Sequence, residues 1–165
     1  MSVYVASDLH LGHRFAATSR GFITTEDHDR HIIRKLSIQC GKRDLLWVLG
    51  DVAWNEESLS MLSELKCDMK MVRGNHDNLK TDAYLKYFNT VEGFLRYKKI
   101  WLSHCPIHPQ EIYRCRGNVH GHIHKGAATK PLPYPYFNVN WDFWDRAVQL
   151  EEIYEFYDRN ETTQA

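Results

Sequence analysis

The sequence contains no C-x-x-C pair, no excess of either charge and no long apolar run. Lysine and arginine total 21, as do aspartate and glutamate, so the formal charge is zero with neutral histidines. This balance disfavours an extended nucleic-acid-binding surface and a polybasic membrane patch. No apolar run approaches the roughly 18 residues of a membrane-spanning helix. We therefore expect a protein without a membrane partner.

Features of a secretory leader are also missing, because the first eight residues, MSVYVASD, have neither a basic segment nor a cleavage site. The four cysteines are Cys40, Cys67, Cys105 and Cys115. We interpret them as reduced thiols of a cytoplasmic protein. A structural zinc site built from Cys105, Cys115 and a nearby histidine is the alternative.

Ten histidines stand out in an otherwise ordinary globular composition of 43% hydrophobic and 25% charged residues. Neutral imidazoles supply metal ligands and proton donors without adding charge. The 165 residues suit one domain. We predict that this domain covers residues 1–157 and that residues 158–165 form a polar, frayed tail.

Five short apolar runs, at residues 3–6, 45–49, 69–72, 100–102 and 118–119, predict β-strands. Helical spacing predicts three helices. The first covers residues 26–38 and is capped by Thr24 or Thr25, the second begins after its cap Asn55, and the third covers residues 79–88. Residues 126–136 contain three prolines and predict a loop. A strand beginning at Val148 and a helix containing Leu150 and Tyr157 are alternatives for the C-terminal segment. Strands that alternate with helices indicate an α/β fold.

Each predicted strand is followed by carboxylate, amide or imidazole groups. The carboxyl ends of parallel strands meet at one edge of a sheet, where α/β proteins bind ligands. Oxygen and nitrogen ligands without sulfur suit manganese, iron or zinc better than calcium. Seven residues with one bridging carboxylate give each of two ions four protein ligands. These residues are Asp8, His10, Asp51, Asn75, His104, His122 and His124.

In chain order, the polar residues form five blocks: Asp8-x-His10, Gly50-Asp51, Gly74-Asn75-His76-Asp77, His104, and Gly121-His122-x-His124. This ordered set resembles the calcineurin-like metallophosphoesterase superfamily. Gly12-His13 and Arg20-Gly21-Phe22 resemble a subfamily of small bacterial and phage phosphoesterases, in which proline usually occupies the position of Gly21. The resemblance implies an α/β fold, a four-layer α/β/β/α sandwich around two mixed sheets.

The resemblance also implies a dinuclear metal-dependent phosphoesterase, with roles for particular residues. Asp8, His10, Asp51 and His124 would hold one ion, and Asp51, Asn75, His104 and His122 would hold the other. A hydroxide bridging the ions would attack phosphorus in line, with His76 as general acid and Asp77 orienting it. We expect two Mn²⁺ ions, with Fe, Zn, Ni and Mg as alternatives.

We expect a small phosphoester or nucleotide-like substrate, and a phosphodiester in preference to a monoester. His13, Arg14 and Arg20 are candidates for contact with the substrate phosphate, because guanidinium matches phosphate oxygens. An ordinary surface position is the alternative for each of these three residues. His28 and His31, within the first predicted helix, are expected at the surface.

Three features keep two interpretations each. His108 belongs either to the rim of the site or to the surface. An extended chain would place His120 on one face with His122 and His124, but we favour a supporting or core position because the family motif begins at Gly121. Aromatic residues at positions 134–144 either stack on a nucleobase or fill the core. The alternative function is a metal-binding scaffold of the same fold without turnover. The pair His76 and Asp77 favours the enzyme, and the oligomeric state stays open.

Overall fold

The computed structural model describes residues 1–126, 130 and 132–163. Among these residues, none of the helices has the length and apolar character needed to cross a membrane. The elements are β1 (Val3–Ala6), α1 (Arg14–Ser19), α2 (Thr25–Gln39), β2 (Leu45–Leu49), α3 (Glu56–Ser60), η1 (Met61–Glu64), β3 (Asp68–Val72), α4 (Thr81–Tyr84), β4 (Val91–Glu92), β5 (Phe94–Tyr97), β6 (Ile100–Ser103), η2 (Pro109–Ile112), β7 (Asn118–His120), β8 (Tyr136–Asn138), α5 (Trp141–Trp144), β9 (Val148–Gln149) and α6 (Leu150–Thr163).

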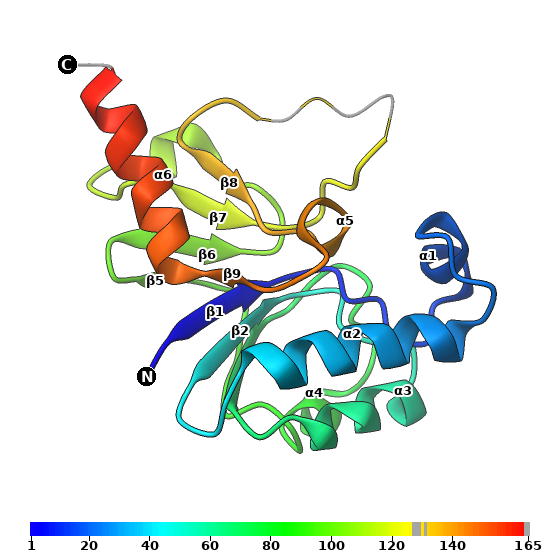
Figure 1. The fold of residues 1–165 in the computed structure, drawn as a ribbon. Helices are drawn as coiled ribbons and strands as arrows, with labels where there is room; N and C mark the ends of the chain where they lie inside the picture. The colour runs from blue at the N-terminus through cyan, green and yellow to red at the C-terminus, as the bar shows by residue number, and fades with distance from the viewer. Residues whose placement is uncertain (127–129, 131, 164–165) are drawn as a thin grey trace.

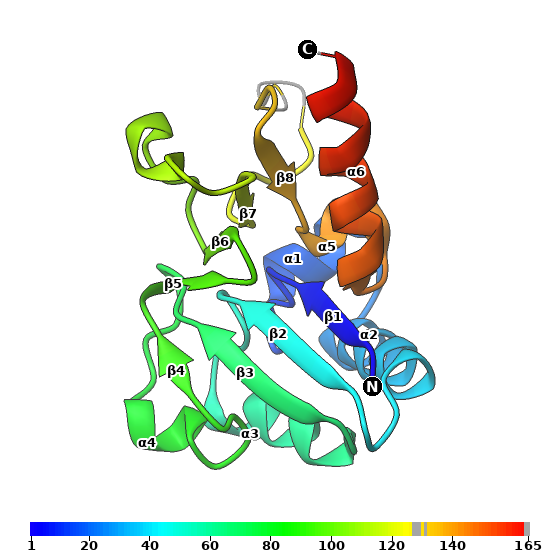
Figure 2. The same ribbon diagram turned by 90° about the vertical axis from the view of Figure 1, so that its left-hand side faces the viewer.

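The described strands form two mixed sheets, as the sequence predicts. One sheet has the order β4-β3-β2-β1-β9, in which β1 to β4 are parallel and β9 is antiparallel to β1. Figure 2 shows β1, β2 and β3 running in the same direction. The other sheet has the order β5-β6-β7-β8, with an antiparallel β5–β6 pair and parallel pairing from β6 to β8. Parallel strands place their carboxyl ends at one edge of each sheet.

The protein has a hydrophobic core on each face of the five-stranded sheet, and successive side chains of β2 point alternately into one core and the other. Leu46 and Val48 pack in a cluster that includes Ile32 and Leu36 of α2. Trp47 and the other residues on the opposite face of β2 pack in a second cluster with Ile100, Leu102 and Val119 of the second sheet. Helices α2 and α3 lie on one side of the five-stranded sheet, and the second sheet lies on its other side (Figure 1).

Helix α6 lies on the side of the second sheet, and its Ile153 and Tyr157 are buried in the core between the sheets (Figure 1). The tail that we expected to fray from residue 158 instead continues this helix to Thr163. Arg116 pairs with Asp158 and Glu161, which holds the last turns of α6 against the loop before β7. Residues 164 and 165 lie outside the described part of the chain.

The structure confirms the five predicted strands, the helix predicted over residues 26–38 and a helix after Asn55. The N-cap of α2 is Thr24, whose side-chain oxygen accepts a hydrogen bond from the backbone N–H of Asp27 at 3.0 Å. Asn55 caps α3 by accepting from the N–H of Ser58 at 2.8 Å. Both caps satisfy N–H groups that have no partner within the helix.

Short elements account for the differences from the sequence predictions. The helix expected over residues 79–88 is limited to Thr81–Tyr84, and Tyr136 begins strand β8 instead of ending a loop. Residues 127–129 and 131 of that predicted loop lie outside the described residues. Both alternatives for the C-terminal segment occur, because Val148 pairs with β1 and helix α6 begins at Leu150. The four cysteines are free thiols, as expected.

Candidate metal centre

The seven candidate ligands lie just beyond the carboxyl ends of five strands from both sheets. Two groups of their atoms converge, and within each group the ligand atoms lie within 4.8 Å of one another. The first group is Asp8, His10 and His124, and the second is Asp8, Asp51 and His104. Asn75 and His122 join the second group through His104. The structure therefore brings all seven predicted residues into one continuous cluster.

In the first group, the Nε2 atoms of His10 and His124 are 3.3 Å apart. Asp8 Oδ1 is 3.8 Å from His10 Nε2 and 3.4 Å from His124 Nε2. The other oxygen, Asp8 Oδ2, accepts hydrogen bonds from Ser7 Oγ and from the backbone N–H of His122. Asp8 Oδ1 is fully buried and has no hydrogen-bond partner among the described residues.

In the second group, Asn75 Oδ1 lies 2.8 Å from His104 Nε2 and 2.9 Å from His122 Nδ1. The two imidazole nitrogens are 3.3 Å apart. Asp51 lies between the two groups, because its Oδ2 is 3.7 Å from His10 Nε2 and 3.4 Å from His104 Nε2.

The hydrogen atoms of the imidazoles decide what this cluster can bind. His104 Nδ1 is 2.8 Å from the carbonyl oxygen of Leu49, which can only accept, so this nitrogen carries a proton. A neutral His104 therefore directs the lone pair of Nε2 at the oxygen of Asn75. Likewise, His124 Nδ1 donates to Asp142 at 2.8 Å, so a neutral ring directs its Nε2 lone pair at Asp8. Lone pairs that converge in this way fit a cation, which the donor set would accept.

Neighbouring charges and burial shift the pKa values of the candidate ligands in different directions. The hydrogen bond to Asp142 and the nearby carboxylate of Asp8 raise the pKa of His124 from 6.5 to about 10. Burial favours a higher pKa for Asp51, but the hydrogen bond and charge of His104 outweigh it and lower the pKa to about 2. Burial lowers the pKa of His10 to about 4. Without an ion, His124 is thus the residue that supplies positive charge to the buried carboxylates.

Four candidate ligands have a backbone conformation that residues other than glycine rarely adopt. The φ angles are 58° at Asp8, 51° at His10, 54° at Asp51 and 65° at His122. Such left-handed conformations cost free energy and persist where the surrounding structure holds them. Their concentration at the strand ends supports a binding role for this edge.

Gly74 explains the close approach of the loops after β2 and β3. A Cβ atom at Gly74 would lie 2.3 Å from Asp51 Oδ1 and 2.5 Å from the backbone nitrogen of Asp51. The same oxygen of Asp51 accepts a hydrogen bond from the N–H of His76 at 2.9 Å. A side chain at Gly74 would therefore displace the candidate bridging carboxylate.

Asp77 occupies a different place from the one that we expected. Its Oδ2 accepts from the backbone N–H groups of Gly74 and Asp51 at 2.7 and 2.9 Å, and its Oδ1 accepts from Val52 at 2.9 Å. Tyr84 also donates to Oδ1, at 3.3 Å. These contacts join the loops after β2 and β3, so the buried carboxylate holds the backbone rather than orienting the ring of His76.

His76 itself is exposed at the mouth of the site, and its ring centroid is 5.9 Å from that of His10. The ring of Trp54 lies 6.2 Å from His76 and 4.4 Å from His13. His13 caps α1, because its Nδ1 accepts from the N–H of Ala16 at 3.1 Å. Trp54, which is 51% exposed, is a residue of the rim that the sequence analysis missed. Its position three residues after Asp51 was the available signal.

Arg20 packs against the site, and its guanidinium group is engaged by the protein instead of being available to a phosphate. Its Nε donates to Asp142 at 2.8 Å, and Nη2 donates to the carbonyl oxygen of Asp8 at 2.7 Å. Nη1 donates to the carbonyl of Leu9 at 3.0 Å and contacts His28 Nε2 at 2.9 Å. All three guanidinium nitrogens are thus committed to the protein, which corrects the predicted substrate contact.

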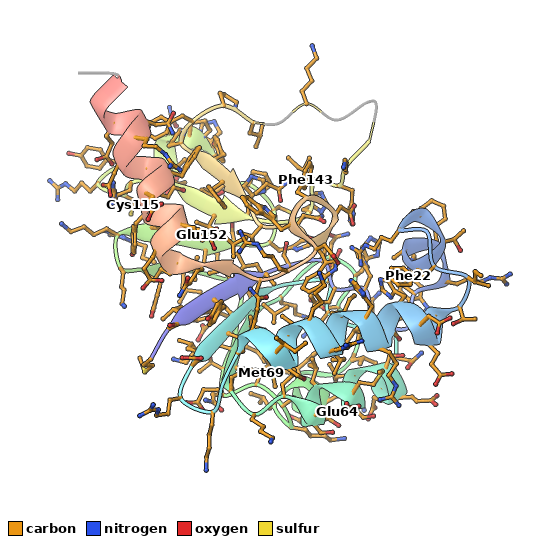
Figure 3. All side chains as sticks on the ribbon, in the orientation of Figure 1. Phe22, Glu64, Met69, Cys115, Phe143 and Glu152 are labelled. Carbon is orange, nitrogen blue, oxygen red and sulfur yellow. The ribbon has the colours of Figure 1, made fainter. Side chains whose placement is uncertain are left out.

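Arg14 lies on the exposed face of α1, which leaves its predicted substrate contact untested. Gly21, next to Arg20, has φ of 84°. Proline, with its φ fixed near about −65°, cannot adopt this turn. Phe22 then packs on α2, where its ring is 5.4 Å from that of His28 (Figure 3).

His28 is fully buried, although we expected it at the surface. Its Nδ1 donates to Asp29 at 2.7 Å, and Asp29 accepts from the N–H of Gly12 at 2.8 Å. The chain Asp29–His28–Arg20 therefore links α2 to the turn after β1. The four-residue spacing of His28, Ile32 and Leu36 on α2 was the sequence signal for this burial.

The remaining histidines and aromatic residues lie outside the ligand cluster. His108 is exposed and caps η2, and His120 is buried with Nδ1 donating to the carbonyl of Gly121 at 2.8 Å. Phe137 and Trp141 are buried in the core. Others line a cavity of about 330 Å³ that His120 of β7 also borders: Tyr134, Tyr136, Phe143 and Trp144. Phe143 belongs to α5 and is labelled in Figure 3.

The two mixed sheets and the cluster at the strand ends agree with the fold that the five sequence blocks imply. A family model for the calcineurin-like phosphoesterase superfamily domain matches residues 1–138, so the chain belongs to this superfamily. This membership confirms the resemblance inferred from the five sequence blocks.

Two phage proteins and a bacterial structure are similar over most of the chain. The Gene 66 protein of Mycobacterium phage D29 is 28% identical over 190 residues, which cover 93% of this chain and 94% of the relative. The Gene 66 protein of Mycobacterium phage L5 is 26% identical, covering 93% of each chain. The crystal structure of AQ665, a protein of unknown function from Aquifex aeolicus, has a TM-score of 0.76 and 25% identity. It covers 94% of this chain, and the match spans 98% of that protein.

The role of Arg20 can be tested by its stability effect. Arg20→Lys keeps the charge but loses the planar fork, so we expect the free energy of unfolding to fall by about 1–3 kcal/mol in urea denaturation. Arg14→Lys, at an exposed position, should change it by less than about 0.5 kcal/mol. Equal stability of the two variants would contradict a structural role for the hydrogen bonds of the Arg20 guanidinium.

The pair of Asp142 and His124 predicts a pH effect. Asp142→Asn should lower the pKa of His124 by about one unit or more, as measured by NMR titration of ion-free protein. Since folding raises this pKa from 6.5 to about 10, the stability from the pair is complete below pH 6.5 and is lost as pH rises through 10. Asp145→Asn, which removes the partner of His31, is the control and should leave His124 unchanged. An unaltered pKa in Asp142→Asn would refute the pairing.

Proposed function

We propose that this protein is a phosphoesterase that uses two divalent ions at the strand ends. The observation that carries the proposal is Asp8 Oδ1, which is buried without a hydrogen-bond partner among the described residues and faces His10 and His124. A buried carboxylate oxygen without a donor is costly, and a cation removes that cost. Membership of the calcineurin-like phosphoesterase superfamily supports the same activity.

The seven residues would divide between the two ions, with Asp51 shared. Asp8, His10, Asp51 and His124 would hold one ion, and Asp51, Asn75, His104 and His122 would hold the other. The amide of Asn75 contributes an oxygen without charge, which limits repulsion of an anionic substrate. Bound divalent ions, with Mn²⁺ as our choice, would neutralise phosphate oxygens and lower the pKa of a coordinated water.

His76 is our candidate for the general acid. Its backbone N–H is fixed by Asp51 Oδ1, while its exposed ring lies at the mouth beside Trp54. An imidazolium in this position would donate its proton to the oxygen of the leaving group as the ester bond breaks. Imidazole suits this task because it exchanges a proton near neutral pH.

A small phosphodiester is our choice of substrate. Trp54 and His13 form an aromatic rim next to His76, and Trp54 is half-exposed. The rim offers an apolar surface to an organic arm of the substrate, and a diester carries two such arms whereas a monoester carries one. The zero formal charge gives little surface for tracking an extended nucleic acid.

Metal-dependent hydrolysis tests the proposal directly. With Mn²⁺ added, we expect turnover of bis(p-nitrophenyl) phosphate above that of p-nitrophenyl phosphate, and loss of both in EDTA. Faster monoester turnover would overturn the diester preference only. Bound metal without turnover on a panel of monoesters, diesters and cyclic phosphates would instead favour a metal-binding scaffold.

Two variants separate proton donation from metal binding. His76→Asn should retain both ions and lose about 10²–10⁴-fold in turnover, with the greater loss for poor leaving groups. Asp51→Asn should lose metal content, measured by elemental analysis, because it removes the shared ligand. His108→Asn, at an exposed residue away from the cluster, is the control. Wild-type turnover in His76→Asn would exclude its role as general acid.

A further inference from the structure

A thiol lies beside the second group of candidate ligands. Single ligand atoms of His104, Cys105 and His122 all lie within 4.8 Å of one another. Cys105 directly follows His104 at the end of β6 and is exposed. The preceding residue, His104, places its Nε2 atom 2.8 Å from Asn75 Oδ1 and 3.4 Å from Asp51 Oδ2. The thiol therefore stands at the open side of this group, where a further ligand could reach an ion.

The surroundings hold Cys105 in this place. Ser103 Oγ donates to the carbonyl oxygen of Cys105 at 2.7 Å. Two residues later, the N–H of Ile107 donates to Asn118 Oδ1 at 3.0 Å, which ties the loop to β7. Asn75, His104 and Cys105 line one surface hollow. The loop thus presents the thiol to the same hollow as the oxygen and nitrogen ligands.

An independent observation indicates that a cation belongs in this space. Asp8 shares a group with His104, and its Oδ1 is fully buried without a hydrogen-bond partner among the described residues. A second buried carboxylate borders the same space, because Asp51 Oδ2 lies 3.4 Å from His104 Nε2. Two buried carboxylates therefore lie next to His104, independently of the thiol.

We propose that Cys105 is an additional ligand of the ion held by His104 and His122, and that it favours a thiophilic ion such as Zn²⁺ over Mn²⁺ at this position. The inference rests on the proposed function, since it needs an ion in the second group. Thiolate is a soft ligand that selects zinc-like ions, whereas carboxylate and amide oxygens suit manganese. On coordination, the sulfur–hydrogen bond breaks, the sulfur keeps the electron pair and the proton passes to solvent.

Cobalt(II) provides a probe that reports sulfur ligation directly. Wild-type protein loaded with two equivalents of Co²⁺ should show a thiolate-to-cobalt charge-transfer band in the near ultraviolet. Cys105→Ser should lose this band and still bind Co²⁺ through the histidines, as shown by its visible d–d absorption. Cys115→Ser is the matched control and should keep the band, because Cys115 lies beside α6, where Arg116 pairs with Asp158 (Figure 3).

Competition between metals tests the selectivity. Cys105→Ser should reduce the ratio of Zn²⁺ affinity to Mn²⁺ affinity by about tenfold or more, because a lost thiolate ligand weakens zinc binding more than manganese binding. Two results would show that Cys105 is not a ligand: cobalt bound to the wild type without the charge-transfer band, or an unchanged band in Cys105→Ser. Either result would leave the phosphoesterase proposal standing. Failure of the wild-type protein to bind any Co²⁺ would overturn both.

Discussion

Two carboxylates, Asp8 and Asp51, are buried where the neighbouring parallel strands β1 and β2 end, and their charge has to be compensated locally. Backbone N–H groups reach one oxygen of each, from His122 and His76. Imidazoles surround the oxygens that remain. The left-handed φ angles at both carboxylate residues and the absence of a side chain at Gly74 follow from this arrangement, because each lets a loop approach its carboxylate closely. In the function that we propose, a divalent ion would complete the compensation that a proton on His124 otherwise provides.

The packing of the two sheets sets the distance across the site. Trp47 and Leu49 of β2 share a core with Ile100 and Leu102 of β6, so the ends of these strands are held in a fixed relation. His104 reaches across this boundary, because its Nδ1 donates to the carbonyl of Leu49. Arg20, further along the chain, supports the turn after β1 by donating hydrogen bonds to the carbonyl oxygens of Asp8 and Leu9. The rigid core thereby pre-positions the ligands, which reduces the ordering cost of binding.

The convergence of the ligands could be predicted because it depends on local patterns, namely short apolar runs followed by polar residues. The supporting contacts could not, because they join residues far apart in sequence. Arg20 meets Asp142, 122 residues later, and no pattern near Arg20 distinguishes this brace from a phosphate clamp. Asp77 is adjacent to His76 in sequence, yet its carboxylate turns to backbone amides of other loops. The short edge strand β5 was missed because its side chains are partly or fully exposed and its neighbour β6 supplies most of the apolar signal.

We propose that the strand ends hold two divalent ions that share Asp51. Anomalous scattering at the manganese edge, measured from crystals equilibrated with Mn²⁺, would locate these ions. We expect two anomalous peaks on either side of the Asp51 carboxylate, about 3.5–4 Å apart, one beside His10 and His124 and the other beside His104 and His122. A single peak, or peaks away from Asp51, would contradict it.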